Sequence, residues 1–140
     1  MVIGLGGFSL AILALASTMP AVAADDFISG VYAPSEDLCA QARTEGLQTV
    51  LEAGNVLLTA RGFEGIEYHC EFLDVTKAAR SAGWLANALC EQPGHAFPDV
   101  VSIMPRAEGQ LEITSVRVAD PDDAGGNGGT YFQCEGVEAP

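Results

Sequence analysis

Two histidines and their neighbours are the residues best suited to chemistry in this chain. His69 stands in the run Glu67-Tyr68-His69-Cys70-Glu71, where alternate side chains share one face of an extended strand. Glu67, His69 and Glu71 would then lie roughly 7 Å apart. Two carboxylates and an imidazole suit a divalent ion or a general acid and base. A solvated strand face explains the same pattern, so we keep the three as candidate binding residues and predict no metal site.

The second histidine, His95, lies between two prolines in the run Gln92-Pro93-Gly94-His95-Ala96-Phe97-Pro98. Proline restricts its own φ angle, so this segment is expected to be a rigid loop. Rigid loops that carry a histidine and an aromatic ring form binding sites. A structural turn between two strands is the alternative. We therefore keep His95 and Phe97 as further candidate binding residues.

Motifs of the common enzyme and cofactor classes are absent from the sequence. It contains no Gly-x-Ser-x-Gly, no His-Glu-x-x-His, no phosphate-binding loop and no dinucleotide fingerprint. The run Asp120, Asp122 and Asp123 fails the calcium-loop spacing at Ala124 and Tyr131, where oxygen ligands are required. We therefore predict no cofactor and no catalytic residue. A small hydrolase using the carboxylates or imidazole around His69 remains the enzymatic alternative.

Four cysteines occur in the chain, and none of them forms a Cys-x-x-Cys pair. That spacing excludes zinc knuckles and thioredoxin-like redox sites. We predict two disulfides, Cys70–Cys90 and Cys39–Cys134, because Cys70 and Cys90 fall on inward faces of neighbouring segments. The competing arrangement is Cys39–Cys70 with Cys90–Cys134.

The first 24 residues are apolar and end in small residues suited to signal peptidase, although no Lys or Arg precedes the apolar stretch. We predict a signal peptide over 1–24 and a single disulfide-stabilised domain over 25–140. Export to the periplasm or the medium agrees with the cysteine content, because disulfides persist in oxidising compartments. No second long apolar segment follows, so we expect no membrane insertion of the mature chain.

The chain is strongly acidic, with 19 Asp and Glu against 6 Lys and Arg and a net charge of −13. Such a surface repels nucleic-acid backbones and anionic lipids. It favours encounter with a basic protein, although acidity also serves solubility alone.

The hydrophobic pattern predicts short strands and one helix. The helix begins after Ser35, which can cap it, and ends near Gly46. Alternation places Ile66, Tyr68, Cys70 and Phe72 inward along one strand. The remaining strands are expected over 26–33, 49–53, 56–60, 84–91, 100–104, 110–118 and 130–135.

Several of these segments carry finer expectations. Gly54-Asn55 is a plausible hairpin turn between the strands at 49–53 and 56–60. The segment 84–91 could also be a helix, since Ala and Leu favour one. A bulge is expected near Thr114-Ser115, and 120–129 is expected to be a loop.

Together the elements predict a mainly β domain of seven to eight antiparallel strands with one short helix. A closed barrel removes the free strand edges that promote aggregation, so we expect a small barrel. A sandwich is the alternative architecture.

The segments GVYA, EYHCEF, WLANALC and TYFQC, with Cys39 among them, resemble small exported bacterial four-cysteine proteins of uncharacterised function. The resemblance implies a strand-rich disulfide fold without an assigned activity. The chain is also similar in size and strand content to periplasmic β-barrel lysozyme inhibitors. It lacks their Ser-Gly-x-x-Tyr strand and aromatic-Lys-Gly segment, so no inhibitory residue is carried over.

The expectation from sequence is therefore an exported, non-enzymatic binding or envelope-associated protein. Inhibition of a cationic enzyme such as lysozyme is the alternative within the binding class.

Overall fold

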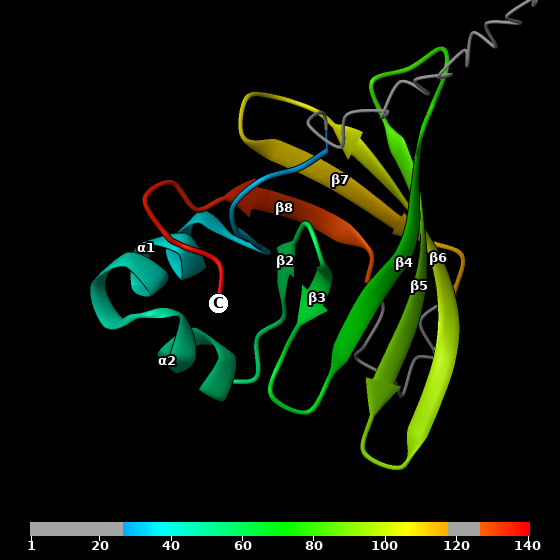
Figure 1. Ribbon diagram of the computed structural model, residues 1–140. Coiled ribbons are helices and arrows are strands. Elements are labelled where there is room, and N and C mark those ends of the chain that lie inside the picture. The colour runs from blue at the N-terminus through cyan, green and yellow to red at the C-terminus, as the bar shows by residue number, and fades with distance from the viewer. Residues whose placement is uncertain (1–26, 118–126) are drawn as a thin grey trace, which may run out of the picture.

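A closed antiparallel barrel, with strands in chain order, dominates the computed structural model, which describes residues 27–117 and 127–140 (Figure 1). Each strand pairs with the next, and the last returns to the first. The predicted barrel is confirmed and the sandwich is wrong. The eight strands of the described residues are β1 Tyr32–Ala33, β2 Leu57–Thr59, β3 Gly62–Glu64, β4 His69–Lys77, β5 Trp84–Gln92, β6 His95–Pro105, β7 Gln110–Ser115 and β8 Gly129–Gln133.

Two short helices lie between β1 and β2 and cover one side of the barrel (Figure 1). Helix α1, Glu36–Glu45, begins where the Ser35 hydroxyl accepts the Leu38 backbone N–H at 3.2 Å. It ends at Gly46, whose φ of 91° suits glycine. Both predicted boundaries of this helix are confirmed.

Helix α2, Leu47–Glu52, was not expected, and the predicted strand over 49–53 is wrong. Leu47, Val50 and Leu51 recur at helical spacing and pack against the barrel side, with Val50 fully buried. The Asn55 side chain donates to the Val50 carbonyl at 3.0 Å and so binds an oxygen near the helix end. Asn55 therefore caps the end of α2 and does not form a hairpin turn between two strands.

Apolar side chains form two separate cores. The first fills the barrel interior, and the second lies between the helices and the outer face of the strands beneath them. The second core consists of Val31, Ala33, Cys39, Ala42, Val50, Leu57 and Cys134, with Leu38, Leu47, Leu51, Phe132 and Val137 packed against it. Phe132 and Cys134, at the end of the last strand and just after it, both contribute to this cluster.

Strand β4 is shorter at its start than expected. Cys70 is buried and Phe72 half-buried, as the alternation predicts, but Ile66 is 57% exposed because the strand begins only at His69. The first strand is likewise reduced to two residues, although Ile28 and Val31 before it are buried.

The predicted bulge at 114–115 is wrong. The register shift lies instead between Phe72 and Asp74, which turns Leu73 outward to 63% exposure. Strand β7 ends at Ser115 and Val116 after it is exposed, so the alternation of inward and outward residues does not have to change at Thr114-Ser115.

Strand β5 confirms the strand interpretation of 84–91, with Ala86, Ala88 and Cys90 facing inward. The rigid loop predicted over 92–98 is wrong, because only Pro93-Gly94 forms the turn and β6 begins at His95. Pro98 is tolerated within β6 because β7 pairs with β6 only from Val101 onward, so the missing N–H costs no ladder bond.

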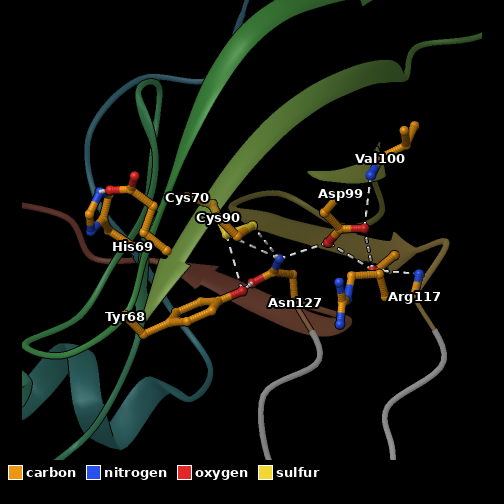
Figure 2. Close-up of a disulfide and its surroundings, with 10 residues drawn as sticks. Tyr68, His69, Cys70, Cys90, Asp99, Val100, Arg117 and Asn127 are labelled. Carbon is orange, nitrogen blue, oxygen red and sulfur yellow. Dashed lines mark hydrogen bonds and ion pairs between the residues drawn. A yellow bond between two sulfur atoms is a disulfide. The ribbon is translucent and has the colours of Figure 1, made fainter. Parts of the chain in front are cut away.

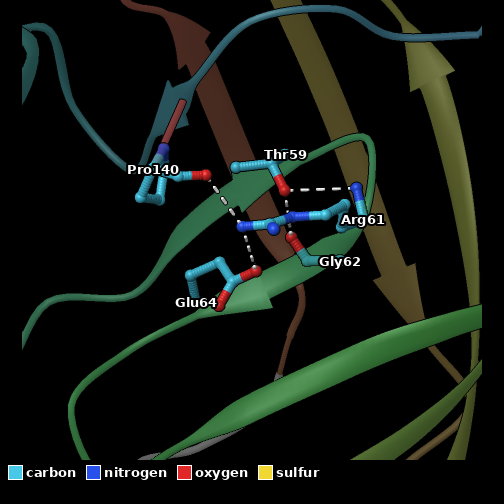
Figure 3. Close-up of polar contacts among 5 residues, drawn as sticks. All are labelled: Thr59, Arg61, Gly62, Glu64 and Pro140. Carbon is cyan, nitrogen blue, oxygen red and sulfur yellow. Dashed lines mark hydrogen bonds and ion pairs between the residues drawn. The ribbon is translucent and has the colours of Figure 1, made fainter. Parts of the chain in front are cut away.

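The turn between β2 and β3 requires glycine. A Cβ at Gly62 would lie 1.7 Å from the Cys70 carbonyl oxygen, and the φ of this residue is 139°. The Arg61 backbone N–H donates to the Thr59 hydroxyl at 3.2 Å and tightens the turn (Figure 3). Strands β3 and β4 can therefore approach closely at this point.

Both predicted disulfides are confirmed. Cys70–Cys90 joins directly paired residues of β4 and β5, and Cys39–Cys134 joins α1 to the residue after β8. No helix among the described residues has the length and apolarity needed to cross a membrane. The predicted signal peptide and the acidic run at 120–123 lie outside the described residues.

Candidate functional site

All five candidate binding residues lie at one end of the barrel, where β4 and β6 begin and β5 ends. We call this end of the barrel the groove end, because a groove lined by Tyr68 and Gln92 opens there. Glu67, His69 and Glu71 are exposed beside or along β4, whereas His95 and Phe97 follow each other along β6. Figure 2 shows His69 and Tyr68 on opposite sides of β4. The structure therefore brings the candidates together as two groups on two faces.

The first group forms an acidic face, which we define as Glu64, Glu67, His69, Glu71 and Glu91. Strand register places His69 between Glu64 of β3 and Glu91 of β5. His69 Nε2 lies 2.9 Å from Glu91 Oε2, and both side chains are about half exposed. Their ion pair, formed when the imidazole is protonated, is screened by water and contributes little to stability.

The guanidinium of Arg61 borders the acidic face but is already engaged. It pairs with Glu64 at 3.4 Å and donates to the Pro140 carbonyl at 3.0 Å (Figure 3). Glu67 and Glu71 form no ion pair with a described residue. The acidic face therefore keeps an excess of negative charge.

The chemistry available to the acidic face is limited. Glu91 can orient His69 as a base, but His69 has no hydroxyl or thiol partner among residues 27–117 and 127–140. In the same part of the chain, no three His, Cys, Asp or Glu side chains form a metal-binding group. A hydrolase at this face would need to activate water directly.

The second group is a stack around Phe97. The His95 ring lies 5.3 Å from the Phe97 ring, and the Arg117 guanidinium lies 3.8 Å above it. Phe97 itself is buried in the barrel core. A cation over an aromatic face is favourable, so Arg117 is held on this ring. Of the two predicted residues, His95 is the one that a partner can reach.

A buried carboxylate lies on β6 two residues after Phe97. Asp99 is 2% exposed and accepts hydrogen bonds from the Val100 backbone N–H at 2.8 Å and the Ser115 hydroxyl at 2.7 Å. It also accepts the Asn127 side-chain amide at 2.8 Å (Figure 2). Three donors compensate the burial of this group.

Asn127 extends the network across the barrel. Its side-chain carbonyl accepts the Tyr68 hydroxyl at 2.7 Å, and its amide nitrogen lies 3.4 Å from the sulfur of Cys70 and 3.6 Å from that of Cys90 (Figure 2). Every buried side-chain nitrogen and oxygen of the described residues has a hydrogen-bond partner. The network therefore fixes Tyr68, the disulfide and the start of β8 relative to one another.

A groove opens beside Tyr68 at the groove end. Two hollows, of about 560 and 460 Å³, share Gly54, Asn55, Val56, Tyr68 and Gln92. The larger hollow is completed by Pro34, Asn127, Gly128, Gly129, Thr130 and Tyr131, and the smaller by Leu51, Glu52, Gly65, Ile66, Glu67 and Pro93. A cavity of this size is in the range of small-molecule sites.

Tyr131 borders the larger hollow and is 5% exposed. Burial, and secondarily the neighbouring Tyr68, raises the pKa of Tyr131 to about 12. The hydroxyl of Tyr131 therefore stays protonated at neutral pH. This hydroxyl forms no hydrogen bond with a described residue, and it is open to water, since no fully buried side-chain oxygen of the described residues lacks a partner.

Sequence reasoning missed the buried network and the groove. Asp99 did carry a signal, because it falls on the same inward phase as Phe97 and Val101. A charged residue at such a position needs buried partners. Asn127 carried no such signal, since it stands in a Gly-rich run that is typical of loops.

No protein-family model, curated protein or solved structure matches this chain.

Proposed function

We propose that this chain is an exported, non-enzymatic binding protein of the periplasm or medium that recognises a basic protein through the acidic face. The observation that carries the proposal is the strand register that sets His69 between Glu64 and Glu91, with Glu71 on the same strand. Carboxylates in fixed positions on a sheet steer a cationic partner and determine its orientation.

Exposed apolar side chains next to these carboxylates support a contact surface. Leu89 pairs with Glu71 across β4 and β5 and is 37% exposed, and Leu73 is 63% exposed. Apolar area among charged residues is the usual anatomy of a protein interface. The two disulfides agree with export, because such bonds form in oxidising compartments.

A cationic enzyme such as lysozyme is one form that the basic partner can take. The oxidised protein is immobilised and exposed to an envelope extract and, separately, to lysozyme, with washes at low and then high salt. We expect retention of a basic protein at low salt and its release at high salt, because ion pairs at the rim are screened. Failure to retain any basic protein would contradict the proposal.

Charge-matched variants separate the acidic face from the overall charge. The triple variant Glu67→Gln, Glu71→Gln and Glu91→Gln is expected to weaken binding by about tenfold, since exposed ion pairs contribute roughly 0.2–1 kcal/mol each. A control variant with Glu108→Gln, Glu135→Gln and Glu138→Gln removes the same charge elsewhere. Equal weakening in both variants would mean that only net charge matters.

The hydrolase alternative has a separate test. Loss of a hydrolytic activity in Glu67→Gln, with an unchanged circular dichroism spectrum, would favour an enzyme over a binding protein.

A further inference from the structure

Among the residues that the structure describes, no charged side chain lines the larger hollow of the groove. Its polar groups are side-chain amides and hydroxyls, and its apolar members include Val56 and Pro34. The polar set consists of Asn55, Tyr68, Gln92, Asn127, Thr130 and Tyr131. Glu52 and Glu67 border only the smaller hollow, so charge lies at one end of the groove. A ligand of the larger hollow is therefore selected by hydrogen bonds and not by charge.

Several of these groups retain hydrogen-bonding capacity. Tyr131 is 5% exposed and borders the hollow, and its hydroxyl forms no hydrogen bond with a described residue. The side chains of Gln92 and Thr130 likewise form no hydrogen bond with described residues. Because no fully buried side-chain oxygen of the described residues lacks a partner, the Tyr131 hydroxyl is reached by water in the hollow, and a ligand hydroxyl can replace that water.

The available groups include both donors and acceptors. Asn55 donates one N–H to Val50 and keeps its side-chain carbonyl as an acceptor. A hydroxyl or Gln92 amide can serve in either role. The complementary ligand therefore carries groups that both donate and accept, as alcohol hydroxyls do.

From these observations we infer that the groove binds a neutral saccharide, with hydroxyls bonded to Tyr131, Asn55 and Gln92. A sugar ring has an apolar face that can pack on Tyr68, and its hydroxyls match the amide and hydroxyl lining. The volumes of about 560 and 460 Å³ leave room for more than one ring.

Other ligand classes fit the larger hollow less well. The part of β6 that β7 does not pair, before Val101, contains Pro98, which lacks an N–H and so makes a poor edge for an extended peptide. A cationic ligand would bind beside Glu52 and Glu67, outside the uncharged part of the groove. The Asn127 network already holds Tyr68 and the start of β8, so the site is preorganised and loses little entropy on binding.

Side-chain amides make the inference directly measurable. The full ¹⁵N-labelled chain is titrated with maltotriose, cellotriose and chitotriose, three neutral oligosaccharides. At least one is expected to shift the side-chain signals of Asn55, Gln92 and Asn127 saturably. Asn87 on the exposed face of β5, and Gln41 on α1, serve as internal controls that stay unchanged.

Two variants test the hydrogen bonds. Tyr131→Phe and Gln92→Ala are each expected to weaken binding of the shifting oligosaccharide by about two- to tenfold. Tyr32→Phe is the matched control, since it removes the hydroxyl of another buried tyrosine that does not line the groove. Gln92 is exposed, so its variant remains informative if Tyr131→Phe folds poorly.

Three results would overturn the inference. The first is the absence of groove amide shifts at millimolar concentrations of all three oligosaccharides. The second is a shift of these signals by tetralysine and not by the oligosaccharides. The third is unchanged affinity in both groove variants. The inference does not depend on the acidic face, so the two proposals succeed or fail separately.

Discussion

The side of the barrel beneath the helices has short strands, of which β1 and β2 are buried on both faces, whereas the opposite side has long strands with one face in water. On the covered side β1, β2 and β8 have two, three and five residues. On the open side β4, β5 and β6 have nine, nine and eleven residues. A short strand forms few backbone hydrogen bonds with its neighbours, so the stability of the covered side depends on packing of the helices. The stability of the open side depends on hydrogen bonding between its long strands.

Each side also has its own disulfide. Cys39–Cys134 fastens α1 over the covered side and spans 95 residues, whereas Cys70–Cys90 links two paired residues of the open side and spans 20. The first bridge joins elements that the backbone ladder does not connect. The second reinforces a pairing that the ladder already specifies.

Removing the covered side's disulfide is expected to give the largest loss of stability. Loop-closure entropy predicts a loss of about 4.7 kcal/mol for Cys39→Ala with Cys134→Ala, and about 3.3 kcal/mol for Cys70→Ala with Cys90→Ala. Urea denaturation of both double variants measures the difference. A larger loss for the open-side pair would show that the contacts of its buried sulfurs outweigh loop closure.

Two leucines, one under the helices and one on the open face, test whether the helices determine how much stability is lost when a leucine is shortened to alanine. Leu57 lies under the helices at 1% exposure, and Leu89 lies on the open face at 37%. Leu57→Ala is expected to lower the free energy of unfolding by about 3 kcal/mol, and Leu89→Ala by less than about 1 kcal/mol. Equal losses, measured by the same denaturation, would mean that the open face is covered in solution, for example by a second copy of the chain.

The buried carboxylate gives the smallest of these three effects. Asp99→Ala leaves the Ser115 hydroxyl and the Asn127 amide without their acceptor, which is expected to cost about 2–3 kcal/mol. Asp74→Ala, an exposed control on β4, is expected to change stability by less than about 0.5 kcal/mol. If the two variants unfold at the same urea concentration, the Asp99 network is not a determinant of the fold.

Sequence reasoning succeeded on the open side, where period-two alternation distinguishes the two faces of β5. On the covered side it located α1 and β2, and its error was the strand expected over 49–53, where the chain forms α2. The six-residue α2 is too short for its period to outweigh the β-branched Thr49 and Val50.

The same reasoning located part of the site. It placed Glu67, His69 and Glu71 in water, since these positions follow from local alternation, but it did not bring His95 to the same end of the barrel. The groove could not be predicted, because it joins side chains from segments that meet only on barrel closure, such as Asn55, Gln92 and Thr130. Such a surface depends on strand register over the whole chain.

The two disulfides are nested, since Cys39–Cys134 encloses Cys70–Cys90 in the sequence. During synthesis from the N-terminus, Cys39 and Cys70 emerge first, and oxidation in order of appearance would join these two. Native pairing therefore requires β4 and β5 to align before oxidation, or an isomerase that exchanges the wrong bridge. A compartment that reshuffles disulfides as well as forming them is therefore expected to raise the yield of native protein in recombinant production.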